Sequence, residues 1–134
     1  MIAKKELFSI LILFFSITCG LQIAGGYYLN EAGGYPDEGA HFMSGVMVHD
    51  YLVSDKKQSA MAFAENYYIH YPKIGIGQWP PFFYAAQAIW MAVFDVSKRS
   101  VLFLLTIITA LIATTIYSQL RKEFTVLVST IPAM

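Results

Sequence analysis

Residues 7–30 read LFSILILFFSITCGLQIAGGYYLN, and this stretch carries no charged side chain. At 1.5 Å per residue, a helix of this length is roughly 36 Å long, which exceeds the roughly 30 Å hydrocarbon core of a bilayer. The stretch therefore predicts a membrane-spanning helix, and with it a membrane protein.

The composition of the whole chain agrees with that assignment. Of its 134 residues, 57% are hydrophobic and 13% are charged, about half the charged share of an ordinary soluble domain. The formal net charge is zero, so no basic field recruits nucleic acid. Cys19 is the one cysteine, which excludes an intrachain disulfide and a cysteine-based zinc site.

Two further uncharged runs lie toward the C-terminus. Residues 101–120 form the first, and as a helix they would extend roughly 30 Å, enough for a second span. Residues 124–134 are apolar but only eleven in number, too few to cross a bilayer. We expect them to be a truncated third transmembrane helix.

Charge and aromatic residues predict the orientation of the first span. Lys4 and Lys5 precede it and place the N-terminus in the cytoplasm by the positive-inside rule, while Tyr27 and Tyr28 mark the outer interface. The expected parts are residues 1–30 as cytoplasmic N-terminus and first transmembrane helix, 31–100 as first extracytoplasmic loop, 101–120 as second transmembrane helix, and 121–134 as cytoplasmic turn and truncated third transmembrane helix.

The same N-terminal pattern is also typical of a secretory signal. The apolar run is longer than a usual signal core, and no clear small-x-small cleavage site follows it. Ala24-Gly25-Gly26 comes nearest to one. We therefore favour an uncleaved anchor, and the cleaved signal is the alternative.

The loop is expected to carry juxtamembrane helices, which makes the fold class all-α. Asp37 is a plausible N-cap for a helix over residues 37–52, with Glu38 in its first turn, where the helix dipole favours a negative charge. Gly75 and Gly77 are expected to keep residues 60–76 from being a regular helix.

A diproline introduces the last helix of the loop. Pro80-Pro81 fits the first turn of a helix, and Phe82–Phe94 follow without a charge. Thirteen residues give roughly 20 Å, too short to span, so we expect a helix at the outer interface. The alternative is a span, which would turn residues 96–100 into a cytoplasmic turn.

The acidic pair Asp37-Glu38 is the first candidate for chemistry. A carboxylate beside a bilayer can act as a general base or help to hold a divalent cation; alternatively, the pair only caps a helix. His41 shares a helix face with both acids, but one histidine with two acids is not a zinc signature. It remains a weak metal candidate, and no other cofactor is indicated.

Substrate-binding candidates lie between the expected loop helices. Lys73 can hold a lipid phosphate as a point charge, or extend toward ordinary headgroups. His70 can meet a phosphate or a sugar hydroxyl, and Gln78 offers hydrogen bonds to a sugar. Trp79 offers a flat face to a sugar ring or to lipid.

The order of these features resembles the N-terminal part of the bacterial protein mannosyltransferase and aminoarabinose transferase group, within the C-type glycosyltransferases. The resemblance rests on the first span followed by Asp37-Glu38, the segment from Tyr71-Pro72-Lys73 to Trp79-Pro80-Pro81-Phe82-Phe83-Tyr84, and Ser97-Lys98-Arg99-Ser100 before the next span.

That resemblance implies an enzyme of the bacterial inner membrane with an extracytoplasmic active face. It would transfer a sugar from a polyprenyl-phosphate donor to a lipid, glycan or protein acceptor. The family's catalytic acid corresponds to Asp37, with Glu38 beside it, and Tyr84 closes the donor-binding segment. The family often has Lys or His before the diproline, where this chain has Trp79, so Lys73 or His70 would take that role.

Because the resemblance covers only the first spans of such an enzyme, we expect the chain to be inactive in isolation. The alternative function is that of a small, non-enzymatic membrane interaction protein with an extracytoplasmic loop. On that alternative, loss of Asp37 changes nothing except stability.

Overall fold

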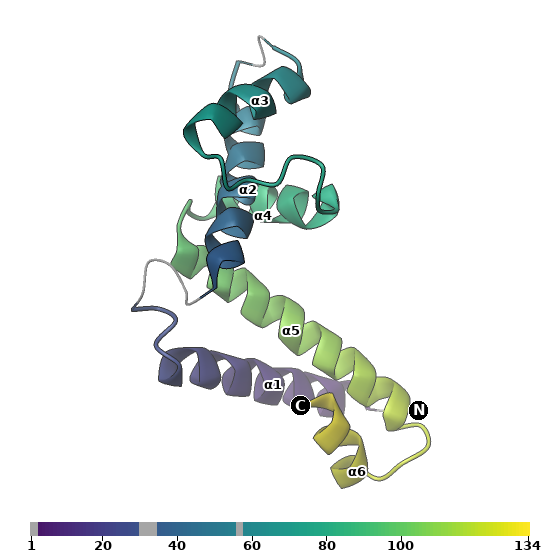
Figure 1. Cartoon of the computed structure of the whole chain (residues 1–134). Helices are drawn as coiled ribbons and strands as arrows, with labels where there is room; N and C mark the ends of the chain where they lie inside the picture. The colour runs from purple at the N-terminus through teal and green to yellow at the C-terminus, as the bar shows by residue number, and fades with distance from the viewer. Residues whose placement is uncertain (1–2, 30–34, 56–57) are drawn as a thin grey trace. The chain divides into compact units, whose positions relative to one another are not determined.

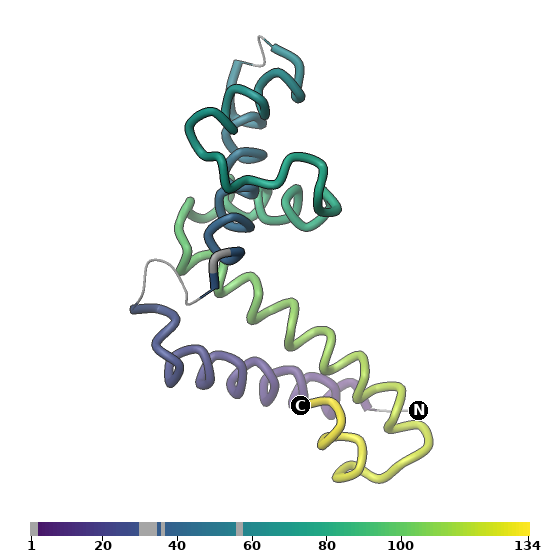
Figure 2. Tube along the Cα trace, in the orientation of Figure 1, coloured from purple at the N-terminus to yellow at the C-terminus, as the bar shows by residue number. Residues whose placement is uncertain are grey.

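The computed structural model describes residues 3–29, 35–55 and 58–134, which form helices joined by turns, with no β-strand among them. This confirms the all-α class for the described residues. The elements are α1 (Lys4–Ala24), α2 (Pro36–Val53), α3 (Ala60–His70), α4 (Pro81–Val93), α5 (Lys98–Leu120), α6 (Val126–Thr130) and the 3-10 helix η1 (Ile131–Ala133), as Figures 1 and 2 show.

Two of these helices are long and apolar enough, by length and composition, to cross a membrane: α1 with 21 residues and α5 with 23. They correspond to the two longer runs identified in the sequence. Gly25 caps α1, and Gly26 adopts a φ of 71°, a conformation that favours glycine. The helix therefore ends before the uncharged run does, and the expected boundary at residues 30 and 31 lies outside the described residues.

The shorter apolar segments form shorter helices. α4 has 13 residues, roughly 20 Å of helix. The C-terminal run forms the five-residue α6 and the three-residue η1. Whether that run belongs to a third span stays a prediction.

The N-cap predicted for α2 is wrong. The helix begins at Pro36 with Tyr35 as its N-cap, so Asp37 lies inside the first turn beside Glu38. Proline is favoured at the first helical position because its φ is already helical and its missing N–H would have no intrahelical partner. Both acids still lie where the helix dipole favours negative charge.

The other loop helices follow the sequence more closely. Residues 60–70 form a regular helix, so the prediction that residues 60–76 are not a regular helix is wrong for this part. The chain is non-helical from Tyr71 to Pro80, the segment that contains both glycines. Gly77 adopts a φ of 73° within this segment. The diproline starts α4 as predicted, with Pro80 as N-cap and Pro81 as the first helical residue.

The chain divides into two compact units, Met1–Tyr27 with Phe103–Met134 and Tyr28–Leu102. In the first unit α1 and α5 run antiparallel, because Thr106 Oγ1 donates to Gln22 Oε1 at 2.9 Å near one end of the pair. Near the other end, Glu6 Oε1 accepts from Tyr117 Oη at 2.6 Å and from Arg121 Nε at 2.9 Å.

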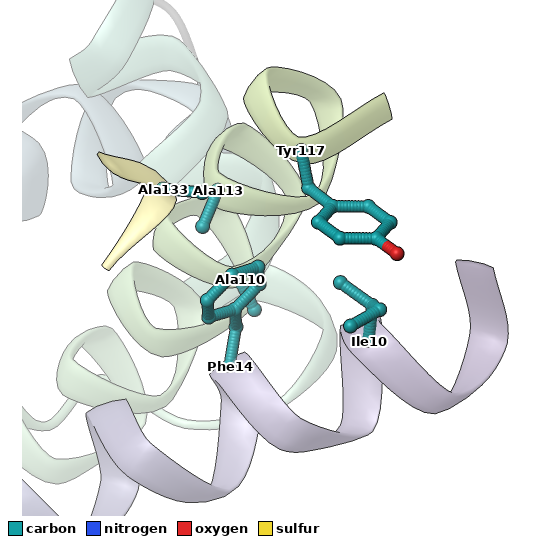
Figure 3. Packing of buried hydrophobic residues seen from close by; sticks show 6 residues of the cluster. All are labelled: Ile10, Phe14, Ala110, Ala113, Tyr117 and Ala133. Atoms are coloured by element: carbon teal, nitrogen blue, oxygen red, sulfur yellow. The ribbon is translucent and has the colours of Figure 1, made fainter. Parts of the chain in front are cut away.

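Small residues line the contact between the two long helices. Alanines on α5 let the helix axes approach closely, as is common between membrane helices. Figure 3 shows Ile10 and Phe14 of α1 directed at α5, with Ala133 of η1 beside Ala113 of α5. The buried cluster consists of Ile10, Phe14, Ala110, Ala113, Tyr117 and Ala133.

The antiparallel pairing predicts a specific cross-link. In a Cys19→Ser background, cysteines at Gln22 and Thr106 should be joined by a short bifunctional thiol reagent, because these side chains are in hydrogen-bond contact. Cysteines at Gln22 and Ser118 are the matched control, since residue 118 lies roughly 18 Å further along α5. A cross-link in the control pair alone would contradict the antiparallel arrangement.

In the second unit, α4 packs against α2. The buried face of α4 contains both polar and apolar side chains. The buried residues of that face are Tyr84, Gln87, Ala88 and Met91. α3 packs on the C-terminal part of α2 through the rings of Tyr51 and Phe63, whose centroids lie 5.4 Å apart.

A hydrogen-bonded carboxylate joins α2 to α3. Asp50 accepts from Tyr67 Oη at 3.2 Å, and its other oxygen lies 3.0 Å from His49 Nδ1. Burial, followed by the Asp50 carboxylate, raises the pKa of the Tyr67 phenol. The phenol therefore stays protonated near neutral pH and continues to donate to Asp50, which fixes the two helices to each other.

Candidate functional site

The two acids of α2 lie in different environments. Asp37 is exposed in the first turn of the helix. Glu38 is half-buried, and its Oε1 forms an ion pair with Lys98 Nζ at 2.9 Å. The pair compensates the charge of Glu38, so Asp37 is the better candidate for a proton-accepting carboxylate.

His41 joins three elements one helical turn after Asp37. Its Nδ1 lies 2.6 Å from the Tyr84 hydroxyl of α4, and its ring centroid lies 4.4 Å from that of Trp79 in the linker between α3 and α4. The structure thus brings together two of the predicted substrate-binding residues, Trp79 and Tyr84, around the histidine predicted as a weak metal candidate.

Burial controls the protonation of Tyr84. The side chain is 6% exposed, and burial raises the pKa of its phenol, against a smaller opposing effect from the hydroxyl of Ser44. The phenol is therefore protonated near neutral pH and can donate its hydrogen bond to a neutral imidazole. In this arrangement His41 serves as a structural centre for the site.

Lys73 and Gln78 line a common pocket of about 430 Å³ between α3 and the linker. Its volume lies in the range of small-molecule sites. Lys73 is the only charged residue among its lining residues, which are Met61, Tyr68, Pro72, Lys73, Ile74, Ile76 and Gln78. A cation in a pocket lined by both polar and apolar side chains suits an anion attached to an apolar group.

The pocket and the histidine centre are connected along the chain. Gln78 lines the pocket, and the ring of the next residue, Trp79, contacts the His41 ring at a tilt of 44°. Gly75 supports this geometry, because a Cβ at that position would lie 2.5 Å from Trp79 Cζ3. The linker therefore holds the indole between the pocket and the first turns of α2.

His70 is not part of this arrangement. It is exposed at the end of α3, and its Nδ1 lies 3.1 Å from the backbone oxygen of Asn66. It does not line the pocket that contains Lys73. Of the two residues considered as substitutes for the family's basic position, Lys73 is the one beside a cavity.

Two residues of the second unit were not found from the sequence. Lys98 was quoted only as part of the segment Ser97-Lys98-Arg99-Ser100, and its partner Glu38 is 60 positions away in the sequence. Gln87 was overlooked because it lies inside an uncharged run. It is 1% exposed, packs against Gly45, and has neither amide atom hydrogen-bonded within the described part of the chain.

The possible divalent cation stays a prediction. Among residues 3–29, 35–55 and 58–134, no three His, Cys, Asp or Glu side chains come together as a group that could hold a metal ion. Nδ1 of His41, the weak metal candidate, is in contact with the Tyr84 hydroxyl.

Comparison of the chain with protein-family models, with curated proteins and with solved structures found no match.

Proposed function

We propose that the chain is part of a membrane glycosyltransferase that takes a sugar from a polyprenyl-phosphate donor. The acceptor is a lipid, a glycan or a protein, and the reaction takes place at the extracytoplasmic face of the bacterial inner membrane. The observation that carries this proposal is the pocket lined by Lys73. Its single cation suits the phosphate of such a donor, and its apolar side chains, which include Met61, Ile74 and Ile76, suit the beginning of the prenyl chain.

The proposed reaction assigns one role to Asp37 and another to Lys73. Asp37 accepts the proton of the acceptor hydroxyl, whose oxygen then bonds to C1 of the sugar. The bond between C1 and the phosphate oxygen breaks, and the lipid phosphate leaves with the bonding electrons. Lys73 stabilises the negative charge that develops on the leaving phosphate, as a positioned cation does for phosphoryl groups.

The arrangement of α1 and α5 supports the proposed topology. When two spans run antiparallel, both ends of the segment that joins them lie on the same side of the membrane. A crossing by α4 between them would make α1 and α5 parallel, whereas they are antiparallel. This favours an interfacial location for α4, in line with its 13 residues.

Charge supports the same orientation. Lys4, Lys5 and Arg121 lie near one end of the α1–α5 pair, where Arg121 contacts Glu6. At the start of α5, Lys98 is compensated by Glu38. Lys4 and Lys5 remain as positive charge at the end assigned to the cytoplasm, as the positive-inside rule expects.

Binding of farnesyl phosphate tests the proposed donor pocket. With the chain in lipid nanodiscs, Lys73→Met should weaken binding by about tenfold or more, since a charge-assisted contact contributes about 1.5–3 kcal/mol. Lys73→Arg should keep most of the affinity because the charge remains. Lys122→Met removes a lysine from the other unit and is the matched control.

If the wild type and Lys73→Met bind farnesyl phosphate with equal affinity, the pocket is not part of the donor site. Two results together would favour the non-enzymatic interaction protein. No variant would bind farnesyl phosphate, and loss of Asp37 would leave the role of the protein in the cell unchanged.

A further inference from the structure

Gln87 is a buried polar side chain without a partner. It lies on the buried face of α4 with a relative exposure of 1%. Neither its Oε1 nor its Nε2 has a hydrogen-bond partner among the described residues. A buried polar group left unpaired destabilises a fold, so the position of this amide needs an explanation.

Glycine on the facing helix makes the position of this amide possible. A Cβ at Gly45 would lie 2.3 Å from Gln87 Cδ and 2.5 Å from both amide atoms. The amide group therefore lies flat against the backbone of α2, in space that any larger residue would fill. The contact holds the side chain in place without offering it a hydrogen bond.

The surroundings of Gln87 belong to the site already described. Tyr84 precedes it by one turn on the same face of α4 and contacts His41, whose ring also contacts that of Trp79. Ser44 precedes Gly45 and is buried, with its hydroxyl donating to the backbone oxygen of Ala40 at 2.8 Å. The amide of Gln87 is thus close in sequence to Tyr84, which belongs to the aromatic part of the site, and lies on the same face of α4.

The chemistry of these groups suits a neutral ligand with several hydroxyls. A primary amide presents an acceptor oxygen beside a donor nitrogen, which can pair with two neighbouring hydroxyls of a sugar ring. The Trp79 indole offers a flat apolar face of the kind that sugar rings pack against. Among these residues none carries a fixed charge, in contrast to the pocket that contains Lys73.

We propose that Gln87 is the residue that recognises the sugar of the lipid-linked donor. When the sugar enters beside Tyr84, the amide leaves Gly45, accepts a hydrogen bond from one hydroxyl through Oε1 and donates one to a neighbouring oxygen through Nε2. This inference rests on the proposed function and adds to it a specificity-determining residue. The unpaired amide is satisfied only in the complex.

The experiment compares farnesyl phosphate with its conjugates to mannose, glucose, galactose and arabinose. The chain is studied in lipid nanodiscs, and the sugar ratio is the dissociation constant of farnesyl phosphate divided by that of the best conjugate. Gln87→Met keeps the length of the side chain and removes the amide. It should lower the sugar ratio by about tenfold, the order of one or two hydrogen bonds, and leave farnesyl phosphate affinity unchanged.

Thermal unfolding provides the second readout. Because Gln87→Met removes an unpaired amide, its unfolding midpoint should equal or exceed that of the wild type. Met91→Leu alters the same buried face without touching a polar group, and it should leave the sugar ratio unchanged. Loss of recognition without loss of stability is the signature that a purely structural glutamine would not give.

Three results would overturn the proposal: an unchanged sugar ratio in Gln87→Met, a sugar ratio of one for every conjugate in the wild type, or a Gln87→Met variant that does not fold. The last result would show that the amide has a partner in the folded chain. If neither farnesyl phosphate nor any conjugate binds the wild type, the proposed function itself fails, which is a different outcome.

Discussion

Replacing Asp37 with asparagine should lower sugar transfer by roughly 10²- to 10⁴-fold, the usual contribution of general acid–base assistance. A carboxylate placed beside the acceptor hydroxyl can accept its proton as a general base. Asparagine has nearly the same size and cannot accept that proton. The measurement is transfer from a polyprenyl-phosphate donor by the protein as the cell makes it, at equal membrane abundance.

The structure makes this variant a cleaner test than the sequence indicated. Asp37 is not the N-cap of α2, so its replacement removes only a favourable charge near the helix N-terminus, about 0.3–1 kcal/mol at an exposed site. Glu38→Gln is the matched control. It breaks the ion pair with Lys98 and should affect stability more than transfer. Parental activity of Asp37→Asn would remove Asp37 from the catalytic role.

A reporter fused after Arg99 should be active outside the cytoplasm, and one fused after Glu123 should be active inside. This is an all-or-none result, because the two positions lie on either side of the uncharged run 101–120 of α5, which is long enough to cross the membrane. Cysteines introduced at Ser54 and Gln58, in a Cys19→Ser background, should react with an impermeant thiol reagent in intact cells. The opposite pair of reporter results would show that α4 crosses the membrane.

The helices could be predicted because their determinants are local. Long runs without charge correspond to α1 and α5, and a diproline marks the start of α4. The errors are local as well. The sequence places two good helix-initiating residues side by side, Pro36 and Asp37, and proline at the first helical position moved the N-cap back to Tyr35. Gly25 and Gly26 ended α1 before its uncharged run was complete.

The site could be predicted only in part because its contacts join distant residues. Trp79 and Tyr84 were candidates from their residue types, yet their meeting with His41 depends on α2 packing against α4. That contact joins residues 43 positions apart. His70 had the right chemistry, but it lies at the exposed end of α3. Gln87 carries no charge and no motif, and only its burial against Gly45 distinguishes it.

The hydrogen bond between Gln22 and Thr106 has a consequence for biogenesis. The two residues are 84 positions apart in the sequence. At synthesis rates of about 5–20 residues per second, Thr106 emerges on the order of 4–17 s after Gln22. In the proposed topology α1 therefore spends several seconds in or beside the insertion machinery before its partner helix exists. Glu6, whose partner Tyr117 follows 111 positions later, has to wait longer still. The hydroxyls of Thr106 and Tyr117 and the guanidinium of Arg121 therefore bond to α1 only after the insertion of α1 has begun.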